Sequence, residues 1–235
     1  DGDGTGGAIT MADGALYDAG TGTITLSADE EITLGGLLTT NTTDNAVSIT
    51  STSDAIIDGG DTHTDIVANT ASAVVSIDAV KGVGTDDAID TQAYILDIDN
   101  ETDGDIRIAE VDDLILNKAV NSNPQGPEDG DISIITTDGS ITVPAGALTN
   151  AVSTGYDGTV TITAQGTDRV LTVNDGVKSV NGAIALSATD DVIFGADGDV
   201  TSTTGNITVT ADSDADVDGS GGALTMNDGT LINAG

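Results

Sequence analysis

A short alternating phrase recurs along the whole chain and restricts the folds that it can adopt. A glycine or small residue precedes two apolar residues separated by one, and a polar turn holding Asp leads to a second apolar pair. The stretches at 22–36 ("GTITLSADEEITLGG") and 182–196 ("GAIALSATDDVIFGA") share six identities in 15 positions. Alternation with a period of two residues indicates half-buried β-strands. No segment carries a convincing helical period, so the sequence predicts an all-β fold.

The spacing of these phrases predicts how the strands are arranged. The first inward apolar residue of each unit recurs about every 15 to 31 residues, at Ile9, Ile24, Val47, Val75, Ile106, Ile132, Val160, Ile184, Ile207 and Leu224. Units that average a little over 20 residues fit the rungs of a parallel β-solenoid. Such rungs stack at about 4.8 Å and align their inward Ile, Val and Leu in columns. We therefore expect a parallel β-helix of about nine or ten rungs.

The two ends of the chain carry nearly the same phrase. Residues 3–20 ("DGTGGAITMADGALYDAG") and 218–235 ("DGSGGALTMNDGTLINAG") are identical at 12 of 18 positions, with an offset of 215 residues. The chain is therefore interpreted as one period of a longer tandem array. Residues 1–20 begin a repeat unit and are equivalent to 216–235, while 21–235 complete one 215-residue period without a separate globular domain. Neighbouring copies joined end to end are the partners that this interpretation predicts.

Composition narrows the core and excludes some partners. Aromatic residues make up only 2% of the chain, which favours a thin, stacked core of Val, Ile, Leu and Ala over a wide globular one. No stretch of 18 apolar residues occurs, so we expect no membrane insertion. Forty acidic residues against five basic ones give a net charge of −35. Because phosphates bind basic surfaces, this charge excludes nucleic acid and anionic membrane surfaces as partners.

With these phrases, the chain resembles the repetitive shafts of filamentous-haemagglutinin-like and other giant bacterial surface proteins. The resemblance rests on the recurring patterns G-x-I-x-I and D-x-x-I-x-x-G, as in "GNITVTADSDADVDG" and "GDISIITTDGSITVPAG", and covers nearly the whole chain. It implies a right-handed parallel β-helix at the cell surface or in an extracellular filament, and it supplies no active-site residues. Rung length varies more here than in a regular haemagglutinin shaft.

A remote alternative is an enzyme, because pectate-lyase-like and polygalacturonase-like enzymes act on polysaccharides from a right-handed β-helix. Their sites combine acidic residues with Arg, Lys or His in a groove. Here the five basic residues and His63 stand far apart in the sequence. An enzyme also seldom needs a 215-residue period copied head to tail. We therefore expect no enzymatic activity.

The first candidate metal site lies near the end of the chain. Acidic residues at alternate positions precede Gly219 in a D-x-D-x-D-G arrangement formed by Asp214, Asp216 and Asp218. Carboxylates on one side of a tight turn suit calcium, which takes six to eight oxygen ligands. The later bidentate glutamate of an EF-hand is missing, and Asp is common in ordinary turns. Calcium is the one cofactor that the sequence suggests.

The second candidate lies within "DIDNETDGD" at 97–105. In an extended strand the odd-numbered acids share one face, and their mutual repulsion favours a bound cation at Asp97, Asp99 and Asp103. The alternative is a solvated turn between two strands.

The sequence thus predicts a structural repeat module of a long, acidic, secreted fibrous protein: a cell-surface stalk, an adhesin shaft or an extracellular filament. The alternative from another class is a calcium-dependent adhesive module that binds glycans, either on this solenoid or on tandem β-sandwich domains. One period carries −31, since residues 1–20 hold Asp1, Asp3, Asp13 and Asp18 and no basic residue. We expect divalent cations to cross-link neighbouring fibres of such charge.

Overall fold

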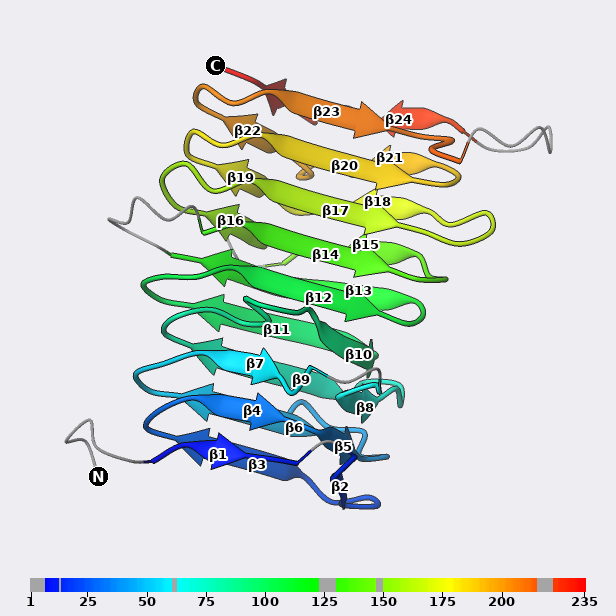
Figure 1. The fold of residues 1–235 in the computed structure, drawn as a ribbon. Coiled ribbons are helices and arrows are strands. Elements are labelled where there is room, and N and C mark those ends of the chain that lie inside the picture. Colours follow the sequence, from blue (N-terminus) through cyan, green and yellow to red (C-terminus); the bar gives the residue numbers. More distant parts are fainter. Residues whose placement is uncertain (1–6, 13, 61–62, 123–129, 147–149, 215–221) are drawn as a thin grey trace.

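The protein is a parallel β-solenoid. The computed structural model describes residues 7–12, 14–60, 63–122, 130–146, 150–214 and 222–235. Every helix or strand assigned among these residues is a β-strand, and every strand pairing is parallel. The strands stack along one axis, with the first at one end and the last at the other (Figure 1).

The strands form two sheets, A and B. Sheet A contains β1 (Ile9–Thr10), β2 (Leu16–Asp18), β4 (Ile32–Leu34), β5 (Gly36–Leu38), β7 (Ile56–Asp58), β8 (Ile66–Ala68), β10 (Ile89–Ala93), β12 (Ile106–Glu110), β14 (Ile132–Thr136), β17 (Val160–Ala164), β20 (Ile184–Ala188) and β23 (Ile207–Thr210). In sheet A, a three-stranded ladder, β1-β4-β7, is connected to a nine-stranded ladder, from β2 to β23, through isolated bridges at Val83. Sheet B contains β3 (Ile24–Ala28), β6 (Val47–Ser51), β9 (Val74–Ala79), β11 (Ile95–Asn100), β13 (Leu114–Asn121), β15 (Ile141–Val143), β16 (Val152–Thr154), β18 (Leu171–Val173), β19 (Val177–Ser179), β21 (Val192–Phe194), β22 (Val200–Ser202), β24 (Leu224–Met226) and β25 (Ile232–Asn233).

The number of turns follows from one column of inward side chains in sheet A. Each residue of this column pairs in register with the next, one turn later, through Ile9, Ile32, Ile56, Val83, Ile106, Ile132, Val160, Ile184 and Ile207. Eight turns of about 25 residues therefore separate the first residue of the column from the last. At about 4.8 Å per turn, they span about 38 Å.

The expected nine or ten rungs of little more than 20 residues are corrected to about eight turns. Some inward residues that the sequence suggests as starts of separate rungs lie on opposite sides of one turn. Ile9 is in sheet A, and Ile24 follows in sheet B before the chain returns to sheet A at Ile32. The structure also contains a turn that the sequence does not predict. It begins at Val83, which forms isolated bridges and belongs to no strand.

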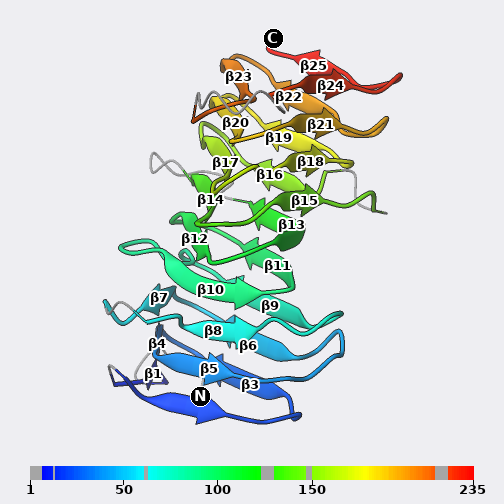
Figure 2. The same cartoon turned by 90° about the vertical axis from the view of Figure 1, so that its right-hand side faces the viewer.

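The bend within each turn changes sides halfway along the coil. In the first turns, two short strands such as β4 and β5 lie in sheet A, and one long strand such as β6 lies in sheet B. Figure 2 looks on to the short strands β5 and β8 of this half. From β14 onward, sheet A holds one long strand per turn, and sheet B holds two short ones such as β15 and β16. The change occurs within a run of successive long strands, from β9 to β14.

The core is thin and almost entirely aliphatic, as the low aromatic content predicts. Inward side chains alternate with outward ones along the strands, as the buried Ile132 and Ile134 of β14 illustrate. Apart from Met11 and Phe194, the buried apolar residues are Ile, Leu, Val and Ala. Phe194 is the one aromatic residue of the chain that is fully buried, while Tyr17 and Tyr156 are about half exposed.

Candidate functional site

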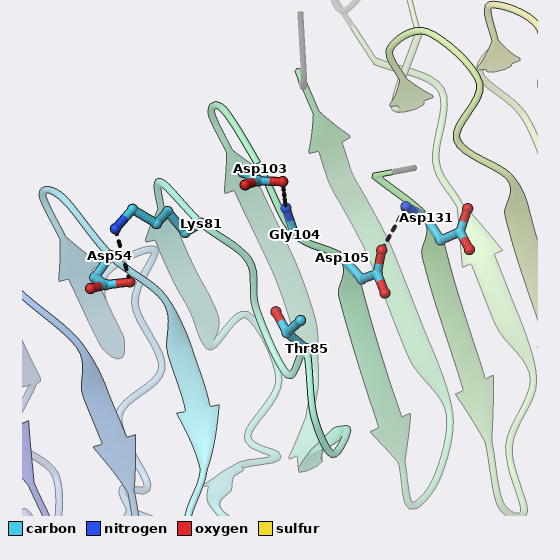
Figure 3. A pocket seen from close by; sticks show the side chains of 7 residues that line it. All are labelled: Asp54, Lys81, Thr85, Asp103, Gly104, Asp105 and Asp131. Atoms are coloured by element: carbon cyan, nitrogen blue, oxygen red, sulfur yellow. Dashed lines mark hydrogen bonds and ion pairs between the residues drawn. The ribbon is translucent and has the colours of Figure 1, made fainter. Parts of the chain in front are cut away.

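An open, acidic groove of about 530 Å³ lies on one side of the coil (Figure 3). It crosses several successive turns at the corner where the chain enters sheet A. Its lining consists of four carboxylates, one ammonium group, one hydroxyl and one glycine, from Asp54, Lys81, Thr85, Asp103, Gly104, Asp105 and Asp131.

The polar groups of this groove mostly bind one another or the backbone. Lys81 Nζ lies 3.5 Å from Asp54 Oδ1. Asp105 accepts a hydrogen bond from the backbone N–H of Asp131 at 3.0 Å with Oδ1, and one from the Arg107 guanidinium at 2.5 Å with Oδ2. Figure 3 shows these carboxylates spread along the groove instead of converging on one point. These contacts stabilise the corner.

A second open hollow, of about 490 Å³, is lined by one cation, three carboxylates and two further polar residues: Asn69, Tyr94, Asp112, Asp113, Asp138 and Arg169. Arg169 Nη2 lies 2.7 Å from Asp138 Oδ1, and Arg169 Nη1 lies 3.9 Å from Asp113. Tyr94 is the one aromatic residue among the described residues that line the two hollows.

Many aspartates have a structural role that repeats from turn to turn. An Asp directly before a strand accepts a hydrogen bond from the backbone N–H of the residue one turn later. Asp131, before β14, accepts the N–H of Thr159 at 2.7 Å, and Asp199, before β22, accepts the N–H of Leu231 at 2.8 Å. The same contact is made by Asp65, Asp105, Asp113 and Asp191. These carboxylates connect adjacent turns by satisfying backbone donors at the corners.

Buried polar side chains form a second set of connections, inside the coil. Asn100 and Asn121 end β11 and β13 and are almost fully buried. Asn100 Nδ2 donates to Asn121 Oδ1 at 3.1 Å, while Asn100 Oδ1 accepts the backbone N–H of Gly82 at 2.8 Å. In later turns the same inward column holds hydroxyls that donate to backbone carbonyls, from Thr154, Ser179 and Ser202.

Glu110, at the end of β12, is the one acidic side chain in the described chain with no solvent exposure at all. Its Oε2 accepts hydrogen bonds from Thr91 Oγ1 at 2.7 Å and from the N–H of Ala93 at 3.0 Å, and Oε1 accepts the N–H of Val111 at 3.0 Å. Burial raises the pKa of Glu110 from 4.5 to about 8, although these hydrogen bonds oppose the shift. The protonated form therefore predominates at neutral pH.

The second candidate calcium site is divided between a strand and a turn. Asp97 and Asp99 share the outer face of β11, as the sequence predicts for an extended segment. Asn117 donates to Asp97 at 2.7 Å, and Lys118 forms an ion pair with Asp99. Asp103 lies in the following turn, where it accepts the N–H of Gly104 at 2.9 Å. Lys118 therefore already supplies positive charge that the acidic face was expected to draw from a cation.

The outer face of β11 nevertheless keeps an excess of negative charge. Asp78, on the neighbouring strand β9, has its pKa raised by partial burial and by the carboxylates of Asp99 and Glu101, against the opposing effect of Lys118. Among the described residues, no group of three Asp, Glu or His side chains is arranged to hold a metal ion. Calcium at Asp97, Asp99 and Asp103 stays a prediction.

The first candidate calcium site falls mostly outside the described residues. Asp214 is an exposed residue in the turn after β23, whereas Asp216 and Asp218 belong to the segment 215–221, which the structure does not describe. This site also stays a prediction.

Comparison with protein-family models, with curated proteins and with solved structures finds no match to this chain. In the described part of the chain, no helix is long and apolar enough to cross a membrane.

Sequence reasoning missed the polar groups that connect the turns. The aspartates before strands carry a signal, because Asp directly precedes an inward Ile, Val or Leu in "GDISI", "DDLIL" and "DDVIF". Glu110 also breaks the outward placement of charge: it stands at an inward position, two residues after the buried Ile108. Alternation along the strand could have placed it in the core.

Proposed function

We propose that the chain is a structural segment of a long, acidic, secreted fibre that serves as a cell-surface stalk, an adhesin shaft or an extracellular filament. Further copies of the 215-residue period would continue the coil at both ends. The chain would have no catalytic role, and it would act outside the cell.

The observation that carries this proposal is the contrast between equivalent residues at the two ends. Met11 and Met226 occupy the same place in the repeated phrase. Met11 is only 5% exposed, because the second turn lies over it, and its N–H donates to the carbonyl of Thr33. Met226, in β24 at the far end of the coil, is 46% exposed. A further turn stacked on β24 would bury it in the same way.

Exposed apolar residues concentrate at the two ends of the coil. Five of the eight large apolar side chains that are most exposed in the described chain belong to the terminal strands or their immediate neighbours: Leu16, Tyr17, Leu224, Met226 and Leu231. The terminal strands also present unpaired backbone donors and acceptors, as sheet edges do. Apolar surface and open edges together favour stacking of a further copy on each end.

The charge of the coil fits a solvated fibre. A net charge of −35 over about 40 Å is more than one charge for every 2 Å of axis, which is the order found in duplex DNA, at one per about 1.7 Å. Repulsion between such surfaces keeps neighbouring fibres apart at low salt, and divalent cations would reduce it.

The acidic groove is the feature that favours the alternative, a calcium-dependent adhesive module. Four of its seven lining residues are aspartates, which offer the oxygen ligands that calcium takes. Against this, Asp54 is neutralised in part by Lys81, and Asp105 is held by Arg107 and by backbone. The stalk is therefore the stronger proposal.

Tandem proteins test the stalk directly. The test uses three proteins that begin with residues 1–20 once and continue with one, two or three copies of residues 21–235. We expect small-angle X-ray scattering to show that each added copy lengthens the protein by about 40 Å. The rods should also become more resistant to urea as copies are added, because each junction buries new surface. Scattering from separate bodies joined flexibly would contradict the proposal.

Antibodies against the chain should label intact, unpermeabilised cells of the source organism, and labelling only after permeabilisation would contradict secretion.

A further inference from the structure

The two copies of the repeated phrase lie on opposite sides of the coil. The offset of 215 residues makes β24 and β25 the counterparts of β1 and β2. However, β1 and β2 belong to sheet A, whereas β24 and β25 belong to sheet B. The column that starts at Ile9 ends at Ile207, and Leu224, the counterpart of Ile9, lies across the coil in the same turn.

A second pair of similar segments shows the same exchange of sides. Residues 22–36 and 182–196 share six identities in 15 positions, which aligns β3 with β20 and β4 with β21. β3 lies in sheet B and β4 in sheet A, while β20 lies in sheet A and β21 in sheet B. The run of long strands from β9 to β14 accounts for the exchange, since it interrupts the long, short, short order once along the chain. Within this run, β12 pairs with both Val83 and β10 in sheet A, and β13 pairs with both β15 and β16 in sheet B.

We infer that one 215-residue period makes eight and a half turns, so that successive copies in the fibre alternate by half a turn about its axis. This inference rests on the proposed function, because it concerns the junction between copies. The strand of the next copy that corresponds to β3 would follow β25 and dock on β23. It would therefore lie in sheet A, although β3 itself lies in sheet B.

The side chains at this junction fit the proposed pairing. β3 and β23 are both edge strands, each with one side unpaired in the described chain. β20 already packs beneath β23, with Ile184 paired to Ile207 and Leu186 to Val209. The inward residues of β3 form the same Ile, Leu, Ala series as those of β20. In the same register, Ile24 of the next copy would cover Ile207, which is only partly buried in this chain.

The inference changes the expected axial repeat of the fibre. Each copy would advance about 41 Å, from eight and a half turns at about 4.8 Å. Adjacent copies would present opposite sides, so the structure would repeat only after two copies, 17 turns and about 82 Å. Any partner that binds one side of the module would then meet sites alternating on two sides of the fibre.

Pyrene excimer fluorescence in a two-copy protein tests the junction. The protein consists of residues 1–235 followed by a second copy of residues 21–235, and the natural chain has no cysteine that would react. Thr208→Cys in the first copy is combined with Thr25→Cys in the second, because both threonines are exposed on the outer face of their strands. We expect a several-fold rise in the ratio of excimer to monomer emission over the singly labelled proteins, independent of protein concentration.

The comparison pair combines Thr225→Cys of the first copy, in β24 of sheet B, with Thr25→Cys of the second copy. A whole number of turns would bring this pair together instead, so its excimer without one from Thr208 would overturn the half turn while leaving a continuous fibre. Excimer from neither pair would mean that the copies do not stack, which contradicts the proposed function itself. The pair Ser27→Cys and Thr210→Cys, one step along the same strands, repeats the test if the first pair disturbs folding.

Discussion

The buried carboxyl of Glu110 should make the stability of the coil fall as the pH rises toward 8. Its pKa is about 8 in the folded protein and 4.5 as its ordinary value. Between these values the unfolded chain has released a proton that the folded chain retains, so the free energy of unfolding decreases by about 1.4 kcal/mol per pH unit. Between pH 5.5 and 7.5 this amounts to about 2–3 kcal/mol. Above pH 8 both states are ionised, and the contribution of this group to the slope disappears.

Glu110→Gln isolates the effect, because glutamine has a similar shape and does not titrate. Urea unfolding at pH 5.5 and 7.5, followed by circular dichroism at constant ionic strength, gives the loss of stability for each protein. We expect the wild-type loss to exceed that of the variant by about 2–3 kcal/mol. Glu31→Gln, at an exposed glutamate, should keep the wild-type dependence on pH. If Glu110→Gln also keeps it, the carboxyl is ionised throughout, and the burial argument is refuted.

Three further perturbations probe the contacts between turns and between fibres. Asn100→Ala removes the acceptor of the Gly82 N–H and the donor to the carbonyl of Asp103, and should cost about 2–3 kcal/mol in urea unfolding, whereas Asn117→Ala, at an exposed position, should cost under about 0.5 kcal/mol. Gly104→Ala places a Cβ 2.2 Å from the Lys81 carbonyl oxygen at a φ of +76° and should lower stability by more than about 2 kcal/mol. Gly60→Ala, with φ +79° and open space around it, should cost only about 1–2 kcal/mol, and equal costs for the two glycines would refute the close approach of turns. Calcium should increase light scattering by the protein more than sodium chloride of equal ionic strength does, and an unchanged particle size would count against cross-linking.

The fold was predictable from the sequence because alternation reports directly which side chains face inward. The pairs Ile132 and Ile134, or Ile184 and Leu186, are buried as their spacing requires. The thin aliphatic core follows equally well from the scarcity of aromatic residues.

The stacking order was harder to predict, because alternation does not specify which strand lies above which. A long strand of one turn can pair with two separate segments of the neighbouring turn. β12, for example, pairs with both Val83 and β10. The sequence therefore suggested too many rungs. It also did not indicate that equivalent segments lie on opposite sheets.

The role of the acidic residues was also only partly predictable. Composition draws attention to their charge, and regular spacing suggests calcium. In the structure, several carboxylates accept a hydrogen bond from a backbone N–H of the next turn with one oxygen, as Asp131 and Asp199 do. Such contacts depend on residues some 30 positions apart, which local patterns do not bring together.

The parallel ladders of the coil run along its axis, and this determines how a stalk would respond to mechanical pulling. Tension applied from the two ends would act along the inter-turn hydrogen bonds themselves. Each boundary between turns is bridged in both sheets, so the load is shared by two sets of ladders at every level. If a strand lost its pairing in one sheet, the pairing in the other sheet would still connect the two turns. The rod would therefore unfold gradually instead of breaking at a single boundary.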